Sequence, residues 1–165
     1  MGKTKYIFGA ALFAAIIWIT MSGLRDFNIN GNVTNMNETL ISFSTIMKGN
    51  DIKILNNKTA IIKNKEEWSQ LWKEIYPTQA IAPSIDFSKI TLIGTFGGNK
   101  PSGGYEHYIS KIRSYNDRVE VIVEEVSPNE RCFVSKAETQ PYHIIILDKN
   151  DKPVNFIFEE RVISC

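Results

Sequence analysis

The sequence predicts an α+β domain, built from mostly antiparallel strands and one main amphipathic helix, behind an N-terminal transmembrane helix. Strand-like runs stand before and after a single helical stretch, without the alternation that a parallel βαβ fold requires. The composition, 43% hydrophobic and 22% charged over 165 residues, is that of one globular domain. A net charge of +1 lacks the basic excess of proteins that bind nucleic acid, so we expect no such partner.

The first 26 residues are expected to form a membrane anchor. The run Tyr6–Leu24 carries no charge, and as a helix it would extend nearly 30 Å, about the hydrocarbon thickness of a bilayer. Lys3 and Lys5 precede the run, so the positive-inside rule places the N-terminus in the cytoplasm and the remaining chain outside. The expected location is the cell membrane, with a single pass. The alternative is a cleaved signal peptide, which would give a secreted protein.

Residues 27–39 are expected to form a flexible stalk. This segment is rich in asparagine and shows neither helical nor strand periodicity, so it cannot bury enough apolar surface to offset the entropy of ordering it. Two N-x-[ST] sequons begin in it, at Asn32 and Asn37, and a third begins at Asn57. On the predicted outer side of the membrane, these three are possible N-glycosylation sites.

Residues 40–165 form the predicted α+β domain. Its helix is recognised from Trp68, Leu71, Trp72 and Ile75, which recur at the spacing of one helical face and are expected to be core residues. Asn64 is the expected N-cap, and Pro77 ends the helix. The strands are predicted over 40–47, 58–63, 90–96, 105–115, 118–126, 142–147 and 154–163.

Two pairings of these strands are predicted from the turns between them. Asn116 and Asp117 suit a two-residue hairpin turn between 105–115 and 118–126. The turn 148–153 is expected to join 142–147 and 154–163 into a last pair.

No pattern of catalytic or metal-binding residues stands out, so we expect no enzyme, no cofactor and no metal. His107 and His143 belong to no spaced metal motif. A zinc site with Cys132 and Cys165, or a Cys132–His143 dyad, is possible on residue types alone but lacks a supporting signature. The adjacent glutamates at 124–125 and 159–160 indicate solvated strand faces. Two cysteines in an exported domain instead predict a Cys132–Cys165 disulfide.

The segment GGNKPSGG at 97–104 is the candidate partner-binding loop. Its glycines permit positive φ and close backbone approach, whereas Pro101 restricts its own φ and the conformation of Lys100. One interpretation is a hairpin turn that needs these conformations. The other is a shaped loop that contacts a partner. The residues predicted to make that contact are Lys100, Pro101, Ser102, Gly103, Gly104 and Tyr105.

Most of residues 40–160 resembles the C-terminal domain of the PrcB protease-complex subunit family. The resemblance is carried by EEWSQLWKEIY, APSIDFSK, GGNKPSGGY, VEVIVEEVSP and TQPYHIIIL, in that order, with PSGGY and QPYH the most specific. It implies a non-catalytic extracytoplasmic domain whose partner is an exported protein, as in an accessory subunit of a cell-surface subtilisin-like protease complex. It supplies no active site.

Two other functions remain open from the sequence. PSGGY loosely resembles an inhibitory loop of the immunoglobulin-like chagasin protease inhibitors, although the helix with Trp68 and Trp72 does not fit their fold. An enzyme of unrecognised type is the third alternative.

Overall fold

The computed structural model describes residues 38–79 and 81–165. The predicted anchor over 1–26, most of the stalk and the sequons at Asn32 and Asn37 lie outside these residues. Among the residues that are described, no helix is both long and apolar enough to cross a membrane.

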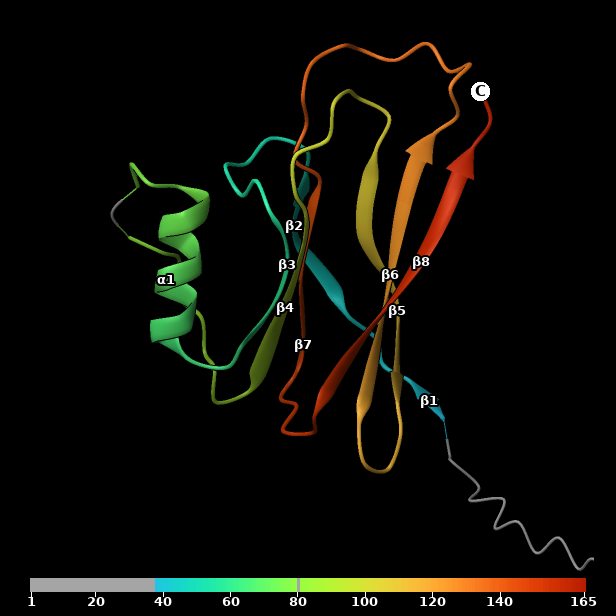
Figure 1. Ribbon diagram of the computed structural model, residues 1–165. Helices are drawn as coiled ribbons and strands as arrows, with labels where there is room; N and C mark the ends of the chain where they lie inside the picture. The colour runs from blue at the N-terminus through green and yellow to red at the C-terminus, as the bar shows by residue number, and fades with distance from the viewer. Residues whose placement is uncertain (1–37, 80) are drawn as a thin grey trace, which may run out of the picture. The chain divides into compact units, whose positions relative to one another are not determined.

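Two four-stranded sheets and one helix make up the described domain (Figure 1). Sheet A has the order β1-β5-β6-β8 and sheet B the order β2-β7-β4-β3. All neighbouring strands are antiparallel except β6 and β8, which run parallel. The strands are β1 (Thr39–Leu40), β2 (Ser44–Gly49), β3 (Asn57–Ile62), β4 (Ile90–Gly97), β5 (Glu106–Ser114), β6 (Val119–Pro128), β7 (Tyr142–Asp148) and β8 (Val154–Ile163).

Helix α1 (Lys65–Ile75) begins where the sequence predicts and packs on sheet B. The Asn64 side chain accepts a hydrogen bond from the Glu67 backbone N–H at 2.9 Å, which satisfies one of the unpaired donors of the first turn. Trp68 is 2% exposed, and its indole N–H donates to the Pro83 carbonyl at 2.9 Å. The expectation that the apolar helical face belongs to the core is therefore confirmed.

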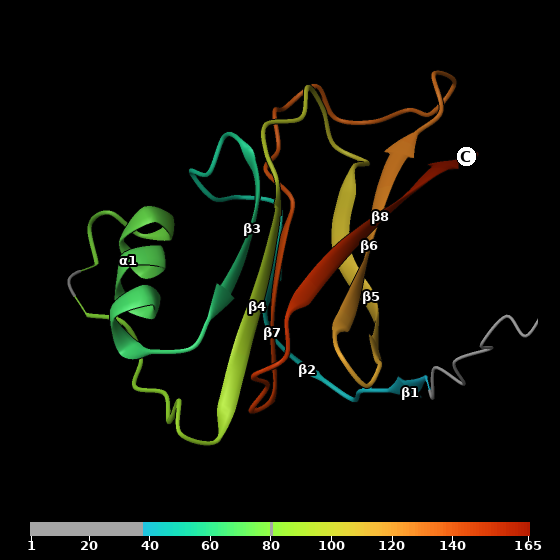
Figure 2. The same ribbon diagram turned by 60° about the horizontal axis from the view of Figure 1, so that its bottom comes forward.

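Sheet B lies between the helix and sheet A, which gives three layers and two hydrophobic cores (Figure 2). One core joins α1 to sheet B through residues such as Trp68 and Phe96. The other joins the two sheets, with Ile93 and Ile145 of sheet B packed against Val121 and Val123 of sheet A. The predicted fold class is confirmed for the described residues, as an α+β domain of mainly antiparallel strands.

Two predicted features of the strands are wrong. The run 40–47 is not one strand, because the chain leaves sheet A after β1 and enters sheet B at β2. Strands β7 and β8 are not a pair either. β7 is buried on both faces and is flanked by β2 and β4, so β8 crosses to sheet A and joins β6. Strand patterns report local conformation and burial, but not which strand becomes the neighbour.

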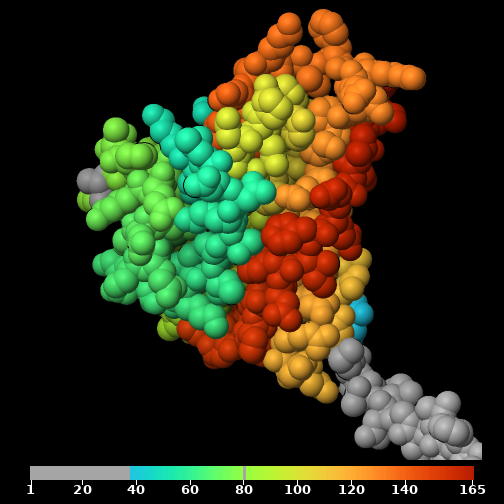
Figure 3. Space-filling view, viewed as in Figure 1, coloured from blue at the N-terminus to red at the C-terminus, as the bar shows by residue number. Residues whose placement is uncertain are grey.

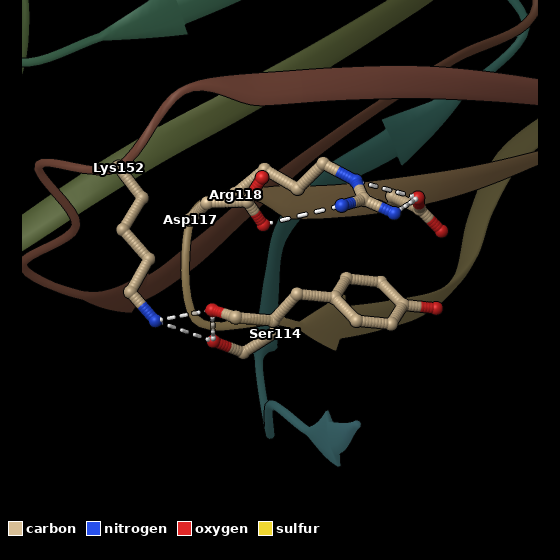
Figure 4. Close-up of polar contacts among 6 residues, drawn as sticks. Ser114, Asp117, Arg118 and Lys152 are labelled. Carbon is tan, nitrogen blue, oxygen red and sulfur yellow. Dashed lines mark hydrogen bonds and ion pairs between the residues drawn. The ribbon is translucent and has the colours of Figure 1, made fainter. Parts of the chain in front are cut away.

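The β5–β6 hairpin has the predicted two-residue turn. The backbone N–H of Tyr115 donates to the Arg118 carbonyl at 2.8 Å, which closes the turn around Asn116 and Asp117. Figure 4 shows the polar contacts that hold it. Arg118 contacts Asp117 at 3.1 Å, while Lys152, just before β8, donates to the Tyr115 carbonyl at 2.6 Å and to Ser114 at 3.1 Å. These contacts fix the start of β8 against the hairpin.

The predicted disulfide is present. Cys132 and Cys165 are bonded, with their Cα atoms 5.3 Å apart. The bond joins the loop after β6 to the end of the chain just past β8, so this edge strand is fixed near both of its ends.

Candidate functional site

The candidate site is a groove on the side of the domain where β3 and β8, the edge strands of the two sheets, face each other. A hollow of about 400 Å³ there is lined by Asn57, Lys58, Thr59, Phe96, His107, Glu125 and Phe158. A second hollow, of about 240 Å³, is lined by Lys100, Tyr105, Glu106, Glu125, Val126, Ser127, Glu160 and Val162. Glu125 lines both, and we call the two together the edge groove. Figure 3 shows the face where β3, β8 and the loop after β4 meet.

The alternation of strand side chains brings these residues into the groove. Val121, Val123 and Glu125 share one face of β6, because successive side chains point to opposite sides. The parallel register places Phe156, Phe158 and Glu160 of β8 beside these three. The face of sheet A that forms the inter-sheet core thus changes from apolar to acidic as it enters the groove.

A buried histidine lies at the base of the groove. His107 is 2% exposed, and its Nε2 lies 2.5 Å from the hydroxyl of Thr95. Its Nδ1 lies 3.1 Å from a carboxylate oxygen of Glu125 but has no hydrogen-bond partner. Burial, helped by the charge of Lys100, lowers the pKa of His107 to about 4, so the imidazole is neutral at neutral pH.

The Thr95–His107–Glu125 series has the order of a hydroxyl, an imidazole and a carboxylate that serves nucleophilic catalysis in hydrolases. The Thr95 side chain is fully buried, however, and it does not line the groove. In this fold, the series orients the His107 ring toward the Glu125 carboxylate.

The second histidine links the two sheets. Its Nε2 is 2.8 Å from the Thr45 hydroxyl, and its Nδ1 accepts a hydrogen bond from the Ile109 backbone N–H at 3.0 Å. Burial and the nearby charge of Lys48 lower the pKa of His143 to about 4. His143 therefore contributes a neutral cross-sheet contact, while Cys132 and Cys165 are committed to their disulfide.

The segment after β4 is not a hairpin turn, because β4 and β5 belong to different sheets. It crosses from sheet B to sheet A and is bonded to the loop before β7. Lys100 and Thr139 exchange two backbone hydrogen bonds, at 2.8 and 3.0 Å, and Gly103 donates to the Ser135 carbonyl at 3.0 Å. Gly104 has φ 82°, and a Cβ there would lie 2.8 Å from the Val134 side chain, so glycine is required on both grounds.

The predicted loop residues divide into two groups. Lys100 and Tyr105 line the edge groove, with the Lys100 ammonium 6.0 Å from the centre of the Tyr105 ring. Pro101, Ser102, Gly103 and Gly104 do not line it. The Ser102 hydroxyl is turned back to the Gly103 carbonyl at 3.0 Å, so this part of the loop supports the wall.

Sequence reasoning missed most of the groove. It interprets the glutamate pairs as solvated surface, whereas the Glu125 side chain is only 25% exposed and faces His107. His107, Phe96 and Phe158 have no local signature that separates them from ordinary strand residues. The missing signal is the β6–β8 register, which depends on strands distant in the sequence.

Asn57, whose sequon lies within the described residues, is the first residue of β3 and is exposed. It also lines the edge groove. A glycan at this position would stand at the β3 wall.

Comparison with known proteins identifies the central part of the domain. Residues 91–148 match the family model described as PrcB C-terminal. This segment belongs to the PrcB C-terminal family. It includes the loop after β4 and strands β5, β6 and β7, so the predicted family is confirmed. No curated protein and no solved structure matches the chain. The PrcB C-terminal segment supplies Phe96, Lys100, Tyr105, His107 and Glu125 to the groove, and β3 and β8 outside it supply the remaining walls.

Proposed function

We propose that this chain is a membrane-anchored, extracytoplasmic and non-catalytic interaction domain, and that it acts as an accessory or stabilising subunit of a cell-surface protease complex. The partner would be an exported protein of the subtilisin-like protease class. The PrcB C-terminal segment supports the link to a protease complex. The disulfide fits an oxidising compartment outside the cytoplasm.

The edge groove is the observation that carries the proposal. It lies between two strands that, among the described residues, each pair on one side only. A loop with a glycine at positive φ forms one of its walls. Unpaired strand edges beside a shaped hollow are a common means of binding another protein.

Capture from native membranes tests this function. The tagged full-length chain is cross-linked in intact cells and purified, and the co-purified proteins are assayed for protease activity. Lys100→Glu should reduce the yield of partner several-fold, because the loop wall would then repel acidic groups of the partner that Lys100 attracts. Lys136→Glu is the matched control, since Lys136 is exposed and does not line the groove.

The activity of the captured protease separates the two protein-binding functions. An accessory subunit leaves the protease active, whereas an inhibitor of the chagasin type suppresses it until the complex dissociates. Capture of no exported protein by the parent chain would contradict both.

A further inference from the structure

We propose that the edge groove binds one basic side chain, lysine or arginine, carried on an extended segment of the partner that pairs with the free edge of β8. The cation would lie between Glu125 and Glu160. This inference rests on the proposed function only in that the partner is a protein.

The first observation is a repulsion within sheet A. The β6–β8 register sets Glu124 beside Glu159 and Glu125 beside Glu160. Like charges directly opposite on neighbouring strands destabilise a sheet. Charges on an edge strand discourage aggregation, but that role does not require glutamate beside glutamate.

The repulsion is offset by neighbouring side chains on the outer face of sheet A but not on the face that lines the groove. On the outer face, Arg161 lies 3.3 Å from Glu124, and the Tyr108 hydroxyl donates to the same carboxylate at 2.6 Å. On the groove face, neither Glu125 nor Glu160 forms an ion pair with a lysine or arginine of the described chain. The charge of the groove face is therefore left for a ligand to neutralise.

The second observation is the unpartnered Nδ1 of His107. The ring is 2% exposed and lines the groove, yet Nδ1 has no hydrogen-bond partner although it is 3.1 Å from Glu125. The ring nitrogen and the carboxylate are thus close together without a hydrogen bond between them. An ammonium or guanidinium group supplies donors, and a neutralising charge, to the carboxylate.

The groove walls offer apolar surface to the methylene groups of a basic side chain. Phe158 is half-exposed and lines the same hollow as Glu125, and its ring is 6.3 Å from that of His107. Lysine and arginine pack their methylene groups on such apolar surface, and the cation is attracted to aromatic faces.

The groove's own cations restrict what can enter. Lys58 stands at the β3 wall and is bound to Glu74, while Lys100 stands at the loop wall. Lys58 shares one hollow with Glu125, and Lys100 shares the other with Glu125 and Glu160. A segment with one basic residue between neutral or acidic neighbours therefore fits better than a run of basic residues.

The strand edge supplies the backbone contacts. Among the described residues, β8 pairs with β6 alone, so its other edge offers backbone groups along Val154–Ile163. Phe158 and Glu160 face the groove from this strand, two residues apart. An added strand presents alternate side chains to one face in the same way, so a basic residue on it reaches the acidic pair.

Short blocked peptides provide the test, with the full-length chain in detergent and fluorescence anisotropy as the readout. In the probe peptide, one arginine stands between valines. The matched peptides carry citrulline, which keeps the shape without the charge, or glutamate. The arginine peptide should bind about tenfold more tightly than the citrulline peptide, and the glutamate peptide should not bind.

Glutamine variants show whether the peptide binds in the groove or elsewhere on sheet A. Glu125→Gln and Glu160→Gln should each weaken binding of the arginine peptide by about tenfold, while their melting temperatures stay level or rise as the repulsion is relieved. Glu159→Gln, on the opposite face of β8, is the matched control and should bind like the parent. Equal affinity for the arginine and citrulline peptides, or binding unaffected by both groove variants, would overturn the inference.

The capture experiment keeps the two proposals distinct. If native membranes yield an exported partner but no arginine peptide binds, the inference is wrong and the proposed function stands. If the peptides bind as expected and no exported partner is captured, the proposed function is wrong and the groove remains a site for basic segments.

Discussion

At the scale of single residues, the two histidines illustrate how burial changes the meaning of a side chain. His107 contacts Thr95 across the inter-sheet space, and His143 accepts a bond from Ile109 in the other direction. Both rings are almost fully buried, and the pKa of each is lowered to about 4. In an unfolded chain a histidine has a pKa of about 6.5.

These lowered pKa values predict that the domain loses stability in mild acid. Between pH 6.5 and 4 the unfolded chain binds protons that the folded chain does not, so stability falls as the pH falls through this range. Each histidine should contribute a loss of about 2 kcal/mol between pH 7 and pH 5. Urea unfolding at the two pH values measures it.

The His143→Gln variant is the control for this prediction. Glutamine does not titrate in this range, so the variant should lose about half as much stability as the parent between the two pH values. An unchanged pH dependence in the variant would show that His143 is not responsible.

The same residues show what the sequence can and cannot reveal of the candidate site. Lys100 and Tyr105 are found from the sequence because glycine and proline mark an unusual backbone, and both line the groove. Glu125 and Phe158 are not found, because their strands look like ordinary alternating strands. Their role depends on a parallel pairing between residues that are 35 positions apart in the sequence, such as Glu125 and Glu160.

At the scale of elements, local sequence patterns predict the helix and the hairpin correctly, but they do not predict which distant strands pair. Helix α1 follows from apolar spacing and the Asn64 cap, which act within a few residues of one another. The β5–β6 hairpin follows from a turn of two residues. The misassigned β7–β8 pair shares a short connection, but β7 is fully enclosed by β2 and β4 and has no free edge for β8.

The disulfide should stabilise β8 more than any other strand. Cys165 follows β8 directly, and Cys132 lies in the loop after β6, so the bond holds the end of an edge strand that has one neighbour. On the chain-entropy model, a loop of this length contributes about 3–4 kcal/mol to the free energy of unfolding. Reduction should lower the stability by this amount and increase hydrogen exchange in Val154–Ile163.

Strand β4 serves as the internal reference for that measurement. It is paired on both sides and almost completely buried, so its amides should stay protected after reduction under conditions where the domain remains folded. Equal increases in β4 and β8 would indicate global destabilisation rather than release of the edge. A Cys132→Ser, Cys165→Ser double variant should reproduce the effect without reductant.

At the scale of the whole molecule, the edge groove is built partly from the PrcB C-terminal segment and partly from strands outside it. The PrcB C-terminal segment provides the central strands, the loop and the base of the groove. Strands β3 and β8, which lie outside the segment, provide the two open edges. The base and the open edges of the groove therefore come from different parts of the chain.

The last prediction concerns the orientation of the chain in the membrane. The uncharged run Tyr6–Leu24 behind Lys3 and Lys5 predicts a cytoplasmic N-terminus and an external domain. A disulfide is stable in that location, since cytoplasmic thiols are normally kept reduced. A membrane-impermeant amine reagent added to intact cells should therefore label lysines of the domain, such as the exposed Lys136, as fully as in lysed cells.

The same experiment distinguishes the anchor from a cleaved signal peptide. An anchored chain is recovered in the membrane fraction at its full mass, whereas a cleaved chain appears in the medium without its first residues. A cytoplasmic protein that has exposed lysines is the control. It must remain unlabelled in intact cells. If the domain is labelled only after lysis, the external location is wrong. The groove would then lack access to an exported partner, so the proposed function would fall with the topology.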